Sequence, residues 1–366
     1  QMGSEASVGL STAIDELSET ELSEALGSIP SRARERIVSA LDTLNVALDM
    51  DVMGGLPFPQ IPAHGGNGKV QPQEWGMSVR QLNQFLNACK QTPLWGQIMH
   101  TQGFGGKIGY VNGYDLCNEF VKPWTMGTGC SVALLMNAIP KAAEVMISHS
   151  WAEDIEEFQE VLCSIDLETS VYFCICANYQ AEDAAGPSIS EQLAMEPFTK
   201  VIDAATRMIV IHTSRAEVYE RLWCCHEIEK ALQHGEPFQL ESMCSKAYSK
   251  NIDSVAETIA QWALLFGGAE KVGYKNLIYT QALPFLKMIA VDTERADCSL
   301  AEDRQRISHQ VMESGGFQLL NYHIMKYRFQ MLKRVDVTLF AMPWGDANDG
   351  MAKFVQRYLE FKLDQP

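Results

Sequence analysis

Between residues 143 and 233 the sequence alternates short apolar runs with segments whose apolar residues recur every three or four positions. The runs "EVMIS", "SVYFCICA" and "MIVIH" are typical of buried strands, and the segments 151–165, 196–207 and 217–233 are typical of amphipathic helices. A later run, "FLKMIAV", predicts a further strand that ends at Asp292. Strands that are apolar throughout and alternate with helices predict an α/β fold, a parallel sheet with helices on both faces.

The pattern divides the rest of the chain into segments of different character. Residues 1–52 are predicted to be helical, and 53–73 are rich in glycine and proline and form a linker or an ordered surface loop. Residues 74–139 are helical and turn-rich, with Ser78 placed to cap a helix. The α/β domain covers 140–322 with a helical insertion at about 236–285, and a helical segment follows at 323–366.

Composition limits the classes of partner and the compartment. The 366 residues carry a formal net charge of −17, which disfavours nucleic acid and anionic membranes as partners. No apolar run is long enough to cross a bilayer. The ten cysteines are dispersed, several of them in strand-like runs, which favours a reducing, cytoplasmic compartment over a disulfide framework.

Polar residues follow each predicted strand, at the edge where ligands gather in open parallel sheets. Strand ends are also polar simply because loops are exposed, so this pattern alone does not decide between a binding crevice and ordinary loops. The residues concerned are Ser148, His149, Ser150, Trp151, Asn178, Tyr179, His212, Ser214 and Asp292.

The helix "RLWCCHEIEKAL", residues 221–232, combines several reactive residue types. A metal site is excluded because adjacent cysteine and histidine side chains point in divergent directions on a helix. A cysteine nucleophile paired with a distant histidine stays open, although no local signature supports it. Cys174 and Cys176, on one face of a predicted strand, are interpreted as small buried hydrophobic residues. Trp223 and Glu227 lie one turn apart, so both can face one crevice, or they can be a core tryptophan and a solvated glutamate.

Several stretches resemble a Toll/interleukin-1 receptor (TIR) domain. They are "EVMISHSWAED", "VYFCICANYQ", "FTKVIDAATRMIVIHTS" and "RLWCCHEIEKAL", with its W-C-x-x-E pattern. More narrowly, "VKPWTMGTGCS", "SHSW", "CANYQ", "RLWCCHE" and "DRQRI" are similar to a group of TIR-like proteins associated with microalgae and other protists. The resemblance covers about 120–315 and implies a flavodoxin-like sheet.

The resemblance also implies a function. Some TIR domains cleave NAD+ at the nicotinamide–ribose bond to give ADP-ribose or a cyclic product, and their essential glutamate corresponds to Glu227. Loops Ser148–Asp154 and Asn178–Ser190 then border and cover the cleft, with Trp151, Tyr179 or Trp223 available to stack on a ring. NAD+ is expected as substrate, with no tightly bound cofactor and no metal.

Alternatives remain open at this point. Other TIR domains are non-catalytic modules that act by self-association, and a nucleoside or nucleotide transferase could use the same crevice. The predicted insertion at 236–285 departs from the TIR pattern and leaves the shape of the cleft in doubt.

Overall fold

The computed structural model describes residues 62–103, 109–251, 291–298 and 300–335, all within one compact unit, Gln60–Pro366. Its five-stranded sheet has the order β1-β3-β2-β4-β5. The strands are β1 (Met77–Ser78), β2 (Val145–Ser148), β3 (Ser170–Tyr172), β4 (Arg207–His212) and β5 (Gln239–Cys244). Strands β2 to β5 pair in parallel, whereas β1 runs antiparallel to β3. The α/β class is therefore confirmed, but the sheet is mixed because an edge strand is added from the preceding segment.

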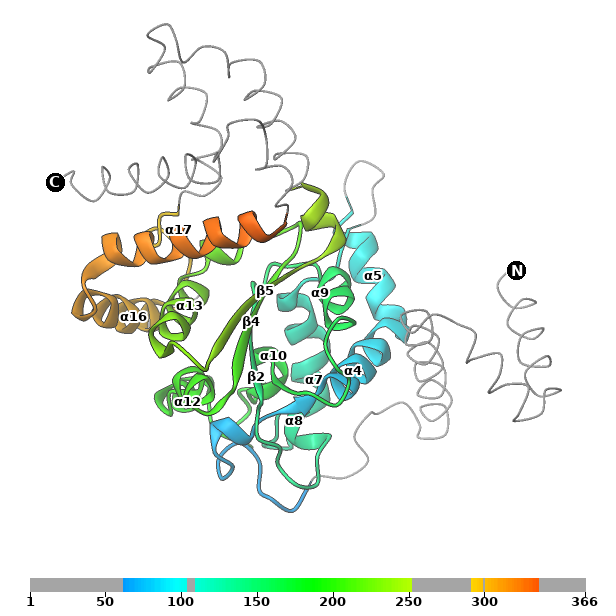
Figure 1. Ribbon diagram of the computed structural model, residues 1–366. Coiled ribbons are helices and arrows are strands. Elements are labelled where there is room, and N and C mark those ends of the chain that lie inside the picture. The colour runs from blue at the N-terminus through cyan, green and yellow to red at the C-terminus, as the bar shows by residue number, and fades with distance from the viewer. Residues whose placement is uncertain (1–61, 104–108, 252–290, 299, 336–366) are drawn as a thin grey trace, which may run out of the picture. The chain divides into compact units, whose positions relative to one another are not determined.

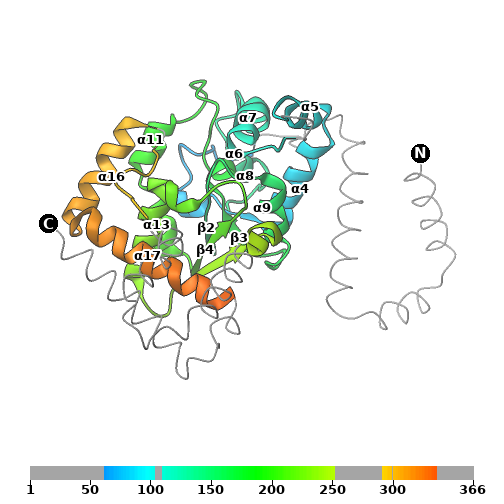
Figure 2. The same cartoon turned by 90° about the horizontal axis from the view of Figure 1, so that it is seen from above.

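Helices cover both faces of the sheet (Figures 1 and 2). Helices α12 (Pro197–Ala204) and α13 (Leu222–His234) lie on one face, and α4 (Val79–Gln91) and α9 (Ile155–Leu162) lie on the other. Helices α16 (Ala301–Glu313) and α17 (Gly316–Val335) pack against α13. The remaining elements are η1 (Pro72–Glu74), α5 (Pro93–Thr101), α6 (Gly113–Asp115), η2 (Leu116–Val121), α7 (Lys122–Thr125), α8 (Val132–Leu135), α10 (Cys174–Ala177), α11 (Ile189–Ala194) and η3 (Val218–Glu220).

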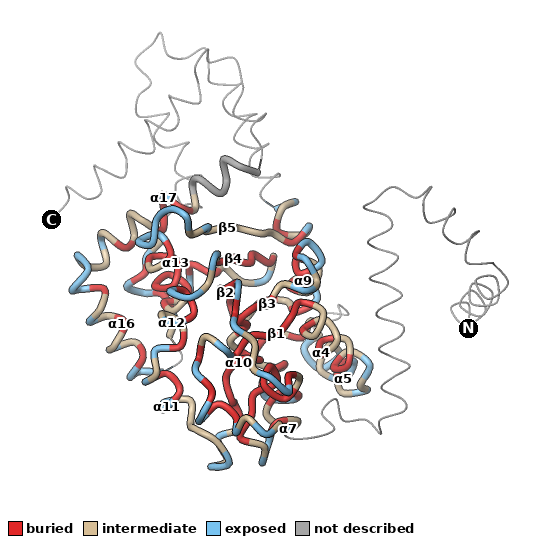
Figure 3. The backbone as a smooth tube through the Cα atoms, turned by 60° about the horizontal axis from the view of Figure 1, so that its bottom comes forward, coloured by how far each residue is buried: buried red, intermediate tan, exposed pale blue. Residues whose placement is uncertain are grey.

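The core lies around the central strands, where every residue of β2 and β3 is buried (Figure 3). These strands are sandwiched between helices, which is why their sequence is apolar without alternation. On α9 the predicted stripe is confirmed, since Ile155, Phe158 and Leu162 are buried. The helix begins later than predicted because the Asp154 carboxylate accepts N–H bonds from Glu156 and Glu157 and so forms its N-cap.

The second predicted strand is shorter than its apolar run. Strand β3 ends at Tyr172, and Cys174–Ala177 form a helical turn in which the Phe173 carbonyl accepts the N–H groups of Cys176 and Ala177. The prediction that Cys174 and Cys176 share a strand face is therefore wrong. A short buried apolar run fits a strand or a helix equally well, which explains the error.

The fourth parallel strand is also not where the pattern placed it. Strand β5 follows α13 directly and pairs with β4 from Arg207 to His212, so the predicted helical insertion is wrong for residues 239–244. Gly235, with φ of +63°, ends α13 and allows this short return. In the predicted strand "FLKMIAV", residues 285–290 lie outside the described residues, and the described part after them, including Asp292, is not a strand.

The segment before the sheet belongs to the same compact unit. Residues 74–139 supply β1 and also α4, which begins after Ser78 as predicted. The loop before β1 is ordered, because the buried Asn67 side chain donates to the Ala177 carbonyl and accepts from the Ser131 N–H. The predicted helical segment 1–52 lies outside the described residues, as does 336–366 of the predicted C-terminal segment.

Candidate functional site

Glu227 lies on α13, and its side chain is held against the end of β2. Ser148, the last residue of β2, donates its hydroxyl to Glu227 Oε2 at 2.6 Å. Glu227 is 6% exposed, so this carboxylate is almost wholly removed from water. A second contact joins α13 to the loop that follows β2, because Cys224 Sγ donates to the His149 carbonyl at 3.2 Å.

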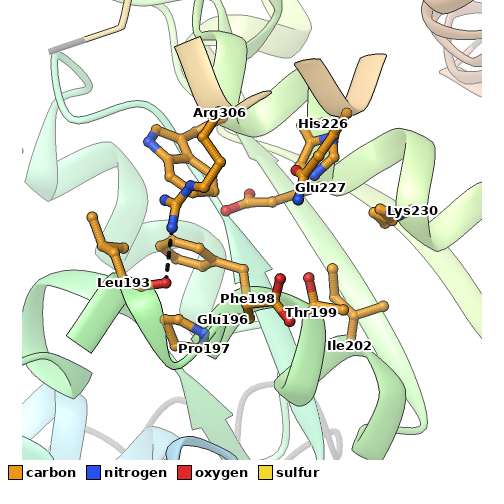
Figure 4. A pocket seen from close by; sticks show the side chains of 12 residues that line it. Leu193, Glu196, Pro197, Phe198, Thr199, Ile202, His226, Glu227, Lys230 and Arg306 are labelled. Atoms are coloured by element: carbon orange, nitrogen blue, oxygen red, sulfur yellow. Dashed lines mark hydrogen bonds between the residues drawn. The ribbon is translucent and has the colours of Figure 1, made fainter. Parts of the chain in front are cut away.

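Glu227 forms part of the wall of a pocket between α12, α13 and α16 (Figure 4). The space between these elements is about 380 Å³ when the part that is open to solvent is included. In Figure 4 the carboxylate is directed toward the space between Arg306 and Phe198. The lining residues are Leu193, Glu196, Pro197, Phe198, Thr199, Ile202, Trp223, His226, Glu227, Lys230, Arg306 and Gln310.

One side of this pocket is aromatic and capped by a cation. The rings of Phe198 and Trp223 are 4.7 Å apart between centroids, and the Arg306 guanidinium carbon lies 5.2 Å from the Trp223 ring. Arg306 is held there by hydrogen bonds that it donates to the Leu193 carbonyl and to Asp303, each at 2.9 Å. The site therefore offers two aromatic rings, tilted by 52° to each other, beside a positive charge.

Burial dominates the electrostatics of the pocket. It raises the pKa of Glu227 to about 7, although the Ser148 hydrogen bond and the nearby His149 oppose the rise. Burial also lowers the pKa of His226 to about 4, helped by the positive charges of Lys230 and Arg306. Near neutral pH, Glu227 thus exchanges a proton readily while His226 is uncharged. Such a carboxyl can stabilise a cation or transfer a proton.

Of the residues predicted to surround the substrate, the structure brings Ser148 and Trp223 to Glu227. The one-turn spacing of Trp223 and Glu227 has the predicted consequence that both line one pocket. Sequence analysis missed Phe198, Arg306 and Lys230 as pocket residues. Arg306 reaches the pocket from a distant helix, and only its place in the "DRQRI" resemblance could have drawn attention to it.

Other predicted site residues are used for local structure. Asp154 caps α9, and Asn178 accepts a hydrogen bond from the Tyr172 hydroxyl at 2.7 Å. Tyr179 is buried and donates to Asp183 at 2.6 Å, so its ring is not available for stacking. Ser150 is buried and accepts from the Ala152 N–H. None of these four predicted residues lines the Glu227 pocket.

The predicted site residues at the end of β4 and just after it do not line this pocket. His212 is buried and stacks on Tyr248, with ring centroids 5.2 Å apart. Ser214 donates its N–H to Glu157 of α9 at 2.6 Å, and the Ser245 hydroxyl donates to the same carboxylate. His212 and Ser214 therefore join the sheet to neighbouring elements, in contrast to the predicted binding role.

His149 and Trp151 belong to a second polar cluster beside the same sheet edge. His149 Nδ1 lies 2.7 Å from Glu153 Oε1, and His149 Nε2 lies 3.2 Å from Cys174 Sγ. The Trp151 indole N–H donates to the same sulfur at 3.3 Å. Cys174 is thus a half-buried thiol with polar partners rather than the buried hydrophobic residue predicted, whereas Cys176, Cys224 and Cys225 are buried.

No protein-family model, curated protein or solved structure matches the chain. Within the described residues, no group of three or more histidine, cysteine or acidic side chains is arranged to hold a metal ion. In the same part of the chain, no helix combines the length and apolar character needed to span a membrane.

Proposed function

We propose that the protein is a TIR-like NAD+ glycohydrolase that cleaves the nicotinamide–ribose bond, with Glu227 as the catalytic carboxylate. The observation that carries the proposal is the placement of the Glu227 carboxyl in a pocket beside Trp223, Phe198 and Arg306. A nicotinamide or adenine ring can stack on the aromatic side. Arg306 and Lys230 supply positive charge for the diphosphate.

The proposed fold is flavodoxin-like. Counting only the parallel strands in chain order, β3-β2-β4-β5 is the sequence second, first, third, fourth, the order of flavodoxin-like sheets. In such sheets ligands bind outside the carboxyl ends of the strands where the order reverses, here between β2 and β4. Ser148 ends β2 at that point and is bonded to Glu227, which supports a ligand site there.

The proposed reaction requires little of the protein beyond one carboxylate and a bound ring. As the C–N bond breaks, its electron pair leaves with nicotinamide and positive charge develops on the ribose. Ionised Glu227 stabilises that charge, and water then adds to the ribose carbon and loses a proton to solvent, which gives ADP-ribose. Because Glu227 is buried, its interaction with the developing cation is little screened by solvent.

The proposal predicts that purified protein releases nicotinamide from NAD+, and that Glu227→Gln lowers the rate by at least about a hundredfold. Because the ionised carboxylate is the active form, kcat/KM should rise with pH through about 7, the pKa to which burial raises Glu227. Nicotinamide is measured by chromatography over a range of protein concentrations, since TIR enzymes act when self-associated.

A matched control is available on the same helix. Glu229 is also buried, but its carboxylate faces His323 at 3.6 Å and does not line the pocket. Glu229→Gln should therefore retain activity within a few-fold. Equal losses in the two variants would assign the effect to folding and contradict a catalytic Glu227. No release at any protein concentration would instead favour a non-catalytic self-association module.

A further inference from the structure

We propose that Cys174 is a thiolate nucleophile that reacts with hydroperoxides, with His149 as proton donor and Glu153 as the group that orients His149. The three side chains form a continuous chain of contacts. Cys174 Sγ lies 3.2 Å from His149 Nε2, and His149 Nδ1 lies 2.7 Å from Glu153. A nucleophile within reach of a base that a third group orients is the arrangement of activated cysteine and serine enzymes.

Two nitrogen atoms lie within hydrogen-bond distance of the sulfur. The Trp151 indole nitrogen is only a donor, so the sulfur accepts its hydrogen bond. Protonated His149 donates to the sulfur through Nε2 and to Glu153 through Nδ1, which pairs both of its N–H groups. Two N–H donors toward one sulfur stabilise a thiolate in preference to a thiol.

His149 is held in its charged form by its two neighbours. The side chains of His149 and Glu153 are each only 1% exposed. Burial lowers the pKa of His149, but the charges of Cys174 and Glu153 and the hydrogen bonds to them outweigh burial and raise it to about 10. Among the described residues, the second carboxyl oxygen of Glu153 has no hydrogen-bond partner, so His149 is the group there that pairs with this buried carboxyl.

The other titratable groups near the sulfur carry no charge near neutral pH. They are Cys117 of η2, Cys176 of α10 and Tyr172 of β3, and burial raises the pKa of each well above neutrality. All three are therefore uncharged at pH 7. Carboxyl groups also face the cluster: Glu227 of α13 lies near His149, and Asp154 and Glu157 lie near Glu153.

The cluster suits a hydroperoxide better than an acyl donor. Acyl transfer needs N–H donors aimed at a carbonyl oxygen, whereas the His149 and Trp151 donors point at the sulfur itself. With a hydroperoxide, the sulfur attacks the terminal oxygen, an S–O bond forms and the O–O bond breaks. The departing alkoxide takes the His149 proton and leaves as an alcohol, or as water from hydrogen peroxide. The sulfur is oxidised by two electrons to a sulfenic acid.

The chain contains an internal reference for this reactivity. Cys163 is exposed, more so than half-buried Cys174, and its sulfur donates a hydrogen bond to the Gln159 carbonyl of its own helix end. The full chain is treated with hydrogen peroxide at pH 6.5, sulfenic acid is trapped with dimedone, and each cysteine is quantified by mass spectrometry. We expect Cys174 to react at least about tenfold faster than Cys163, because mainly the thiolate reacts. Equal or faster reaction at Cys163 would overturn the proposal.

Two variants test the roles of the donors. His149→Gln keeps a hydrogen-bonding side chain but no charge, so peroxide oxidation of Cys174 should fall about tenfold. Trp151→Phe removes a donor at a half-buried position and should give a smaller loss, which keeps the test valid if His149→Gln does not fold. Fast alkylation by iodoacetamide without fast oxidation by peroxide would rule out hydroperoxides as the substrate class. The outcome is independent of nicotinamide release, so either proposal can fail alone.

Discussion

At the scale of single residues, burial of the Glu227 carboxyl lowers the stability of the folded protein at pH values where the group would otherwise ionise. Burial raises its pKa in the folded protein to about 7, from an ordinary value near 4.5. Between these values the folded state keeps a proton that the unfolded state releases, so the stability falls as pH rises from about 4.5 through 7. A buried group that is destabilising when ionised is common where function, rather than folding, requires it.

This cost predicts that Glu227→Gln stabilises the fold at high pH. Glutamine keeps an oxygen that can accept from Ser148 but cannot ionise, so the variant should gain about 1–3 kcal/mol over the wild type at pH 8. At pH 5 the gain should fall below about 1 kcal/mol, because Glu227 is then protonated in the folded protein and pH 5 lies only slightly above the ordinary pKa of glutamate. Urea unfolding at the two pH values measures the difference. An equal effect at both would show that ionisation of Glu227 is not its source.

At this scale, the sequence can reveal which residues share a site only when those residues lie close together in the chain. Trp223 and Glu227 are one turn apart on one helix, so their shared pocket follows from helical geometry. The contact between Cys174 and His149 depends on the turn after β3, and the position of Arg306 depends on how α16 packs. Neither arrangement leaves a periodic signal in the sequence, and so neither was predicted.

At the scale of elements, the start of α4 shows what local chemistry determines. Ser78 Oγ accepts the Gln81 N–H at 3.2 Å, and the Gln81 side chain accepts the Ser78 N–H at 2.9 Å. This reciprocal capping box satisfies two N–H groups that the helix itself cannot pair. Strand β5 is the opposite case, because its sequence "QLESMC" is half-buried at a sheet edge and its pairing with β4 is set by the return from α13.

We therefore expect Ser78→Ala to lower the free energy of unfolding by about 1 kcal/mol, within the range of N-cap substitutions. Gln84→Ala, at a half-buried position on the same helix, serves as the control and should change it by less than about 0.5 kcal/mol. Both are measured by urea denaturation. A loss for Ser78→Ala no larger than that of the control would mean that the capping box does not stabilise α4.

At the scale of the whole molecule, buried histidines and a buried glutamate have opposite effects on how the stability depends on pH. Burial lowers the pKa of His212 to about 3 and that of His226 to about 4. Neither histidine reduces the stability while it is neutral in both the folded and the unfolded state. Their contribution is complete above about pH 6.5 and is lost as pH falls below it. Glu227 acts in the opposite direction, because its effect lowers the stability as pH rises from about 4.5 through 7. The stability should therefore be greatest near neutrality.

His212 provides the sharpest test of this balance. Its ring lies between Tyr219 and Tyr248, and neither nitrogen has a hydrogen-bond partner among the described residues. Below pH 6.5 the unfolded state gains a proton that folded His212 cannot, which costs up to about 1.4 kcal/mol per pH unit. His212→Phe removes this penalty, so its stability relative to wild type should increase by about 2 kcal/mol between pH 8 and pH 5. Urea unfolding at both pH values measures the change, and a constant difference between variant and wild type would show that His212 takes up its proton in the folded state.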